Sequence, residues 1–264
     1  MTDKSILLEK NNKTGVAILT LNRPDQFNAF NREMVNLWAD TLIDIAADKN
    51  LRAMVLTGAG KAFCAGGDMD ELDSFLTMNM SERKSFLFDN VYRVMRQVHS
   101  MDIPIIAALN GTARGAGLDM ALMCDIRIAD RSAVFAESYI SMGVVAGDGG
   151  SFFLPRLVGL SKALELLWTG DAISGEEAAR IGMISRIVED GQALAEAVKL
   201  AGRIAKQPTE AVRMMKRAAV QSFSTTLDSH LDMISSHMAV VEDSPAFKER
   251  VAAFQARRRR QSLN

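Results

Sequence analysis

The stretch NGTARGAGLDMALMCDIRIAD, residues 110–130, places the small residues Gly-Ala-Gly at 115–117 directly before an apolar run that contains one carboxylate, Asp119. This pattern predicts a helix that begins at the small residues, followed by a strand over 125–130. The first amides of a helix have no partner within it, and small residues let a ligand approach them closely. A lone carboxylate in such a run is costly to bury. The stretch therefore predicts a helix N-terminus with a free amide and an acid of functional importance beside it.

A second segment, FCAGGD at 63–68, has the same design, because it ends an extended piece in two glycines. Each segment alone is explained as a tight turn. Two amides from separate segments that point at one atom would form an oxyanion hole, which stabilises negative charge on a carbonyl oxygen. Together with Asp119 and with Asp148 in the turn GVVAGDGG (143–150), the two segments favour a catalytic site.

Asp148 has a second interpretation. A short acid directly before a helix often caps it by accepting a hydrogen bond from a backbone amide. A helix that starts near Gly149 or Gly150 would allow Asp148 this purely structural role. Both interpretations stay open at the level of sequence.

Short strands and helices alternate over the first half of the chain. Apolar runs predict strands over 15–24, 53–58, 61–68, 103–111, 125–130 and 133–137. Helical spacing predicts helices over 31–50, with Asn31 as N-cap, and over about 81–99. The order strand, strand, helix suggests stacked repeating turns of an α/β fold instead of one doubly wound sheet.

From about Leu160 onward the pattern is almost purely helical. One predicted helix ends at Gly170, the next begins at Ser174, and a third covers about 192–206. A long helix rich in methionine is predicted around 209–241, and a last one after Pro245. An exposed apolar layer of helices on a compact core would suit self-association.

Composition limits the classes of function. The 264 residues include 31 basic and 32 acidic side chains, so no overall charge attracts nucleic acid or anionic lipid. The run Arg257 to Arg260 is interpreted as a solvated, frayed tail. Cys64 and Cys124 lie in apolar surroundings and predict reduced core thiols. The chain starts without a signal peptide and holds no apolar run long enough for a membrane span, which predicts a soluble, cytoplasmic protein.

Several known motifs do not fit. TGAGKAF lacks the third glycine of a dinucleotide fingerprint, and its spacing is not that of a P-loop. The histidines at 99, 230 and 237 have no metal-ligand spacing, so no metal site is predicted. A Gly-x-Ser-x-Gly nucleophile elbow is absent from the sequence.

Five segments, in order, resemble the crotonase (enoyl-CoA hydratase/isomerase) superfamily: LNRPDQFNAF, TGAGKAFCAGGD, NGTARGAGLDMALMCDIRIA, GVVAGDGGSFFLPRLVG and TGDAISGEEAARIGMISRIV. The resemblance extends from about residue 15 to 255. It implies an α/β fold, a spiral of ββα repeats over residues 1–200, and a C-terminal helical trimerisation region over 201–264. It also implies a homotrimer or a dimer of trimers, with an acyl-CoA thioester as ligand and no cofactor besides the coenzyme A of the substrate.

The resemblance also implies roles for single residues. The thioester oxygen would lie between the backbone N–H groups of Gly67 and Ala116. Residues expected at the coenzyme A portion are Ala65, Asp68 and Met69 beside adenine and pantetheine, Arg23 near the phosphates, and Phe247 and Arg250 from the C-terminal helix.

The sequence departs from the family pattern at the acids. Hydratases of this family use two glutamates to hold one water, but Asp119 stands at the first position and Tyr139 at the second. Glu137 lies two residues before Tyr139, on the same face if that segment is extended. Asp148 is the other acid in the loop, and Tyr139 would either offer a hydroxyl to the thioester pocket or pack.

The leading functional hypothesis is hydration of a 2-enoyl-CoA, with Asp119 as principal acid/base and Asp148 as its partner. Isomerisation of a 3-enoyl-CoA or dienoyl-CoA is the alternative, because one carboxylate can move a proton between carbons without activating water. A third hypothesis is a non-catalytic binder of acyl-CoA, or of RNA through the arginine run.

Overall fold

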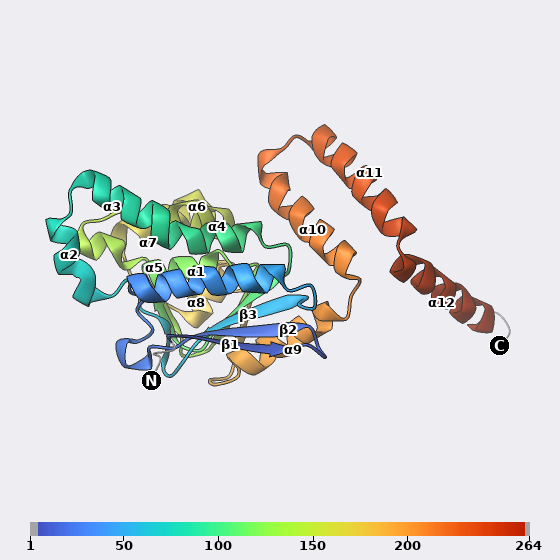
Figure 1. Cartoon of the computed structure of the whole chain (residues 1–264), viewed down its shortest axis with the longest axis horizontal. Helices are drawn as coiled ribbons and strands as arrows, with labels where there is room; N and C mark the ends of the chain where they lie inside the picture. The colour runs from blue at the N-terminus through green and yellow to red at the C-terminus, as the bar shows by residue number, and fades with distance from the viewer. Residues whose placement is uncertain (1–4, 262–264) are drawn as a thin grey trace.

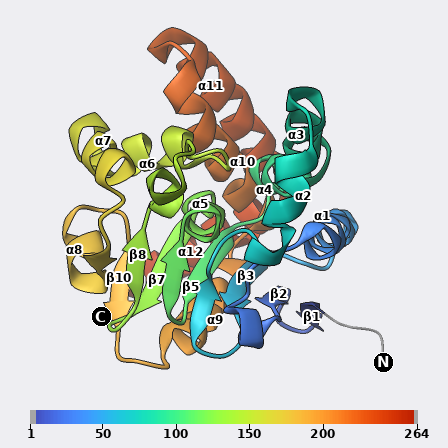
Figure 2. The ribbon, with the colours of Figure 1, turned by 90° about the vertical axis from the view of Figure 1, so that its left-hand side faces the viewer.

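The strands of the protein form two sheets (Figures 1 and 2), and from β3 to β8 consecutive strands alternate between them. The computed structural model describes residues 5–261. The first sheet has the order β1-β2-β3-β5-β7-β10 and is parallel except for β1, and the second has the order β4-β6-β8-β9. The strands are β1 (Ile6–Asn11), β2 (Val16–Leu21), β3 (Ala53–Gly58), β4 (Ala62–Cys64), β5 (Ile105–Leu109), β6 (Thr112–Arg114), β7 (Ile126–Asp130), β8 (Val134–Ala136), β9 (Ile173–Ser174) and β10 (Arg186–Val188).

The pairs β3–β4, β5–β6 and β7–β8 confirm the predicted recurrence. In each pair the first strand joins the larger sheet and the second joins the smaller one, and a helical segment follows. The chain therefore winds as a spiral of ββα turns. The α-helices are α1 (Arg32–Ala47), α2 (Leu72–Thr77), α3 (Met80–Phe86), α4 (Tyr92–Ser100), α5 (Ala116–Leu122), α6 (Gly150–Val158), α7 (Leu160–Thr169), α8 (Gly175–Arg180), α9 (Ala193–Ala205), α10 (Thr209–Gln221), α11 (Leu227–Asp243) and α12 (Pro245–Gln261).

The central strands β3 and β5 of the larger sheet are buried on both faces, which explains their nearly continuous apolar sequences. Along β3, Met54 and Leu56 join the main core with α1 and α4, whereas Ala53 and Val55 face α9. The buried positions of α9 are all alanines, which lets this helix lie close to the sheet. Figure 2 shows α9 on one side of the strands and α1 to α5 on the other.

Local capping agrees with the sequence at two predicted helix starts. The Asn31 side chain accepts a hydrogen bond from the Met34 amide at 2.9 Å and begins α1. Ser174 caps α8 by accepting from the Glu177 amide at 3.2 Å. The helix predicted over 81–99 is present as α3 and α4, joined by one π-helical turn, η3 (Leu87–Val91).

The prediction of one long helix around 209–241 was wrong. A short 3₁₀ segment, η5 (Ser222–Ser224), separates α10 from α11, because Thr226 takes an extended conformation and caps a new helix. Hydroxyl side chains compete with the helical backbone for hydrogen bonds, and apolar spacing alone did not show the break. The strand β1 was also missed, since it is an edge strand whose second half is exposed.

The last three helices project from the spiral (Figure 1). They begin at Thr209, so the boundary predicted at residue 200 falls within α9, which packs on the sheet. The run Arg257 to Arg260 is helical, at the end of α12, and not a frayed tail as expected. Of the helices that the structure describes, none combines the length and the apolar character that crossing a membrane requires.

Candidate active site

The two glycine-rich turns lie against each other, as the sequence predicted. A Cβ at Gly117, in the first turn of α5, would lie 2.2 Å from the carbonyl oxygen of Cys64 at the end of β4. Gly66 has φ +104°, and a Cβ there would lie 3.5 Å from the Ala116 nitrogen. No side chain fits the contact between Cys64 and Gly117, so glycine is what allows the turns to meet.

The backbone amides of Gly67 and Ala116 are both available to a ligand. Within residues 5–261, neither amide donates a hydrogen bond to the protein. The backbone groups on either side of Gly67 are engaged: the Gly66 carbonyl oxygen accepts from the Phe30 amide at 2.8 Å, and the Asp68 amide donates to Phe30 O at 3.0 Å. Space beyond the Gly67 Cα is open, with nothing within 4 Å of a Cβ placed there. That both amides donate hydrogen bonds to the same thioester oxygen stays a prediction.

Asp119 and Asp148 meet at one hydroxyl group. The Asp119 side chain is completely buried, and Asp148 is 7% exposed. Tyr139, in the 3₁₀ turn η4 (Ser138–Met142), places its hydroxyl 2.6 Å from Asp119 Oδ2 and 2.9 Å from Asp148 Oδ2. The N-cap of α6 is Gly149, with no side-chain cap, so the interpretation of Asp148 as a helix cap is wrong. Tyr139 belongs to the acid cluster and is not simply a packing residue.

A third acid, Glu137, lies beside Asp119. Glu137 follows β8 and is 1% exposed, and neither of its carboxyl oxygens has a hydrogen-bond partner as an acceptor. The chain turns into η4 directly after Glu137, so the extended segment considered for Glu137 and Tyr139 does not exist. Both side chains still reach Asp119, by different routes. The sequence signal was a carboxylate directly after a buried strand, which was noted but not assigned a role.

Burial dominates the acid–base properties of this cluster. It raises the pKa of Asp119 to about 7, with the charge of Asp148 acting in the same direction and the hydrogen bond from Tyr139 opposing it. Burial and the neighbouring charges of Asp119 and Asp148 raise the pKa of Glu137 to about 9. The pKa values of Asp148 and Tyr139 are also raised, again chiefly by burial. Asp119 therefore titrates near neutrality, and Glu137 holds its proton to higher pH.

The loop that carries Asp148 is fixed from the opposite side. Tyr92, at the start of α4, donates its hydroxyl to the Gly147 carbonyl oxygen at 2.8 Å. Gly150 leaves room for the acids, because a Cβ there would lie 2.3 Å from Asp119 Oδ1 and 3.0 Å from Glu137 Oε1. The sequence pattern gave no indication of the Tyr92 contact, because the two residues are far apart along the chain.

The structure brings Arg23 and Asp68 together as an ion pair of 2.6 Å, with both side chains largely buried. Arg23 also donates to the Ala29 carbonyl oxygen at 2.6 Å. Ala65 and Met69 border the same turn and are exposed. The charge of Arg23 is thus already paired, and a role for it at the coenzyme A phosphates stays a prediction.

Phe247 and Arg250 lie on α12, at the opposite end of the molecule from α2 in Figure 1. Arg250 donates to Gln207 Oε1 at 3.2 Å, between α9 and α10. Within one chain these two residues do not join the turn at Asp68 and Met69. The expectation that they complete its nucleotide pocket is therefore not met by a single chain, because α11 and α12 point away from the spiral.

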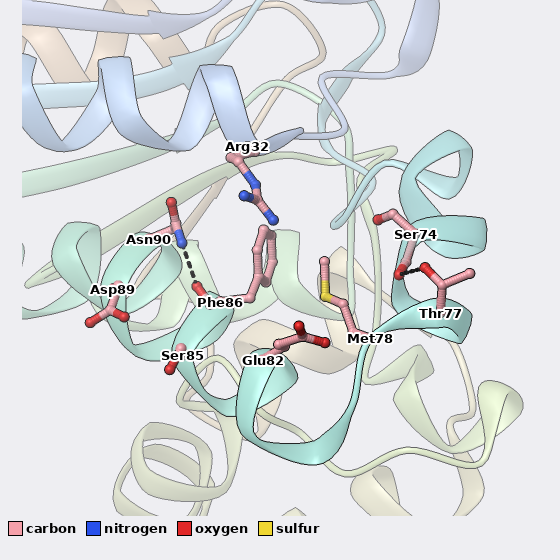
Figure 3. Close-up of a pocket in the computed structure, with 9 residues that line it drawn as sticks. All are labelled: Arg32, Ser74, Thr77, Met78, Glu82, Ser85, Phe86, Asp89 and Asn90. Atoms are coloured by element: carbon pink, nitrogen blue, oxygen red, sulfur yellow. Dashed lines mark hydrogen bonds between the residues drawn. The ribbon is translucent and has the colours of Figure 1, made fainter.

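A separate cavity of about 580 Å³ lies between α1, α2 and α3 (Figure 3). Arg32 extends over the Phe86 ring there, with its guanidinium carbon 4.8 Å from the ring centroid. Polar side chains, among them Ser74, Glu82 and Asn90, line the remainder. This cavity contains none of the residues predicted to be catalytic, so it is distinct from the carboxyl cluster.

Known proteins resemble this chain over nearly its whole length. The 1,2-epoxyphenylacetyl-CoA isomerase of Escherichia coli is 36% identical over 92% of this chain and 93% of its own. The crotonyl-CoA hydratase of Syntrophomonas wolfei is 34% identical over 98% of both chains. The crystal structure of an enoyl-CoA hydratase from Bacillus anthracis superimposes with a TM-score of 0.88 at 31% identity, over 96% of both chains.

The sequence profile of the enoyl-CoA hydratase/isomerase family matches residues 11–262, which include both glycine turns, the carboxyl cluster and the projecting helices. This match and the identity to the relatives above agree with the fold of stacked ββα turns. The protein is therefore a member of the enoyl-CoA hydratase/isomerase family.

Proposed function

We propose that this protein adds water across the double bond of a 2-enoyl-CoA. The thioester oxygen accepts hydrogen bonds from the Gly67 and Ala116 amides, which hold the negative charge that develops on it. Ala116 is the first residue of α5, where the positive end of the helix dipole also favours that charge. A hydratase and an isomerase acting on CoA esters among the relatives support this substrate class.

The observation that carries the proposal is the placement of two carboxyl groups on one hydroxyl, Tyr139 Oη, beside these amides. Hydration needs a base and an acid. Asp119, ionised above pH of about 7, takes a proton from water as its oxygen bonds to the β carbon. The electron pair of the double bond moves to the thioester as an enolate. Asp148, which keeps its proton more readily than a free aspartate, then protonates the α carbon.

A second candidate is isomerisation of a 3-enoyl-CoA or dienoyl-CoA. The observation that favours it is that the Tyr139 hydroxyl lies between the two carboxyl groups, where a hydratase of this family would hold its water. With that place filled, Asp119 removes a proton from one carbon and returns it to another. The double bond shifts, and no oxygen is gained.

Isotope tracing separates the candidates. The purified protein is incubated in ¹⁸O-water with crotonyl-CoA and with 3-enoyl-CoA esters, and the masses of the products are measured by mass spectrometry. We expect a 3-hydroxyacyl-CoA that contains ¹⁸O. Conversion of the 3-enoyl ester without ¹⁸O uptake would favour isomerisation. Binding of the esters with no conversion of any of them would leave a non-catalytic acyl-CoA binder.

The proposal also covers the oligomeric state, the location and the cofactor requirement of the protein. The protein works as a trimer or a dimer of trimers, in the cytoplasm, and uses no cofactor besides the coenzyme A of its substrate. RNA is not a partner in this proposal, and the absence of salt-dependent RNA binding is its check.

A further inference from the structure

We infer that Glu137 is a positioning residue, which stays protonated, donates a hydrogen bond to Asp119 Oδ1 and so completes a chain Glu137–Asp119–Tyr139–Asp148 that carries one negative charge. This inference deepens the proposed function, because it concerns how the same site handles protons. It rests on the geometry of four side chains and on the number of protons that their contacts require.

The free oxygen atoms of two acids border the same position, beside Gly150. Asp119 uses Oδ2 to accept from Tyr139, and its Oδ1 is buried without a donor. Glu137 is 1% exposed, and its two oxygens lack a donor as well. Asp119 Oδ1 and Glu137 Oε1 both border Gly150, at 2.3 and 3.0 Å from the position of its missing Cβ. Two ionised carboxylates would repel each other there, and each would leave a buried charge without a partner.

Counting protons resolves this conflict. Each contact between two oxygen acceptors needs one proton. The three contacts Glu137–Asp119, Asp119–Tyr139 and Tyr139–Asp148 therefore need three, of which the tyrosine hydroxyl supplies one. Two of the three carboxyl groups must then be protonated. In the arrangement that we infer, Asp119 accepts from both Glu137 and Tyr139 and so holds the single negative charge.

The surroundings of Glu137 agree with a neutral side chain. The titratable groups that face the cluster are Asp119 from α5, Tyr139 from η4, Asp148 from the loop before α6, and Tyr92 from α4, which is close to Asp148. All four are acids that can only add negative charge or stay neutral, and among these groups of the described chain none is a cation. Glu137 is therefore held in its neutral form, with the pKa of its carboxyl raised to about 9.

The chain of four side chains also allows the negative charge to move between Asp119 and Asp148 during the reaction. When Asp119 takes a proton from the substrate or from water, it becomes a donor to Tyr139. The Tyr139 hydroxyl then donates to Asp148, which gives its own proton to the substrate. The hydrogen bonds between Asp119, Tyr139 and Asp148 reverse direction, and the single negative charge passes from Asp119 to Asp148. Glu137 does not touch the substrate in this scheme and acts only through Asp119.

The test compares two variants of Glu137 by their pH–rate profiles. Glu137→Gln keeps a donor in the form of an amide, whereas Glu137→Met has nearly the same length and no donor. Losing a hydrogen bond to a charged acceptor makes Asp119 harder to ionise. We therefore expect the acidic limb of kcat to move to higher pH by about one unit in Glu137→Met, and by less than half a unit in Glu137→Gln. KM should change little in either variant.

The opposite shift would overturn the inference. If Glu137 were ionised, removing its charge would make Asp119 easier to ionise, and both variants would move the limb to lower pH. A purely structural role would lower the melting temperature of both variants and leave the limb unmoved, which also contradicts it. Glu165→Met, at an exposed position of α7, is the matched control and should leave the profile unchanged.

A spectroscopic measurement keeps this inference separate from the proposed reaction. Infrared difference spectra of the substrate-free protein at neutral pH should show the carbonyl stretches of two buried protonated carboxyls, Glu137 and Asp148, and Glu137→Gln should lose the Glu137 band and keep the other. Presence of the Glu137 band without turnover of any enoyl-CoA would reject the proposed function but support the protonated Glu137. Failure to find the Glu137 band in the wild-type protein would reject the inference, whatever the enzyme catalyses.

Discussion

Gly150 is the residue whose lack of a side chain is most directly connected to catalysis. Replacing glycine by alanine within a helix ordinarily stabilises a protein by about 0.5–1 kcal/mol. At Gly150 the new methyl group would lie 2.3 Å from Asp119 Oδ1, so the carboxyl group must move. A displacement of about 1 Å can lower the rate on the order of a hundredfold. We expect Gly150→Ala to lose about that much in kcat in a spectrophotometric assay, with little change in melting temperature.

Gly202→Ala is the control for this substitution. Gly202 lies within α9, and nothing is within 4 Å of a Cβ placed there. We expect a small gain in stability and unchanged activity. Equal activity of Gly150→Ala and Gly202→Ala would show that a methyl group at position 150 does not displace the Asp119 carboxyl group.

Asp119 should also make the protein less stable as the pH rises. Its pKa in the folded protein is raised from 3.8 to about 7, so the folded state binds its proton more tightly than the unfolded chain does. Between these pH values the folded state holds more protons, and the free energy of unfolding therefore falls as pH increases through that window. Asp119→Asn cannot ionise. We expect it to lose at least a hundredfold in activity but to melt above the wild type at pH 8.

The difference in melting temperature should be a few degrees and should vanish near pH 4, in a thermal denaturation series from pH 4 to 8. Asp171→Asn replaces an exposed aspartate outside the cluster, and it should follow the wild type throughout. A variant Asp119→Asn that is less stable than the wild type at pH 8 would contradict the assignment of Asp119 as a strained, buried acid.

At the scale of elements, the start of α5 allows a test of the oxyanion hole by removing one backbone amide. Ala116 is the first residue of that helix, a position where proline fits because its nitrogen needs no helical partner. Ala116→Pro deletes the N–H and keeps the helix. We expect kcat to fall about a hundred- to a thousandfold, as measured by steady-state kinetics, because the charged transition state depends on that donor more than the bound ester does.

A matched control exists at the start of α7, where Leu160 is likewise a first helical residue preceded by a glycine. Leu160→Pro should have normal activity and a similar circular dichroism spectrum. Full activity of Ala116→Pro would show that its amide does not bind the thioester oxygen.

At the scale of the whole molecule, α11 and α12 have no buried residue in a single chain. Their exposed large apolar residues are Leu227, Leu231, Met238, Val240, Phe247, Val251 and Phe254. Such a layer costs free energy in water unless another surface covers it. We expect sedimentation equilibrium to give three times, or six times, the mass of one chain.

Leu231→Glu combined with Phe254→Glu should shift this assembly toward single chains. The double substitution Glu210→Gln and Glu249→Gln, at exposed acidic positions of α10 and α12, is a control that should leave the assembly intact. A wild-type protein that sediments as a monomer would mean that these helices fold back or stay uncovered.

The sequence by itself determined the fold and the places of the two glycine turns. Alternating strands, the Asn31 and Ser174 caps and the Gly-Ala-Gly start of α5 are local signals, because they depend on spacing and backbone conformation within a few residues. The order strand, strand, helix indicated stacked turns, and the family resemblance specified them as a spiral of ββα repeats. Asp119 and Asp148 were predicted as site residues from local sequence, because each stands beside a glycine-rich segment.

Only the tertiary structure decided how the acids interact. Glu137 follows β8, Tyr139 lies on η4 and Asp148 on a loop. The relative positions of these segments depend on packing of the whole spiral, and no local pattern predicts that the three residues interact with Asp119. The pairing of Arg23 with Asp68 and the break before Thr226 are further examples. The physical reason is common to all three: proton affinities, ion pairs and helix breaks depend on neighbours in space and on burial, which sequence spacing does not contain.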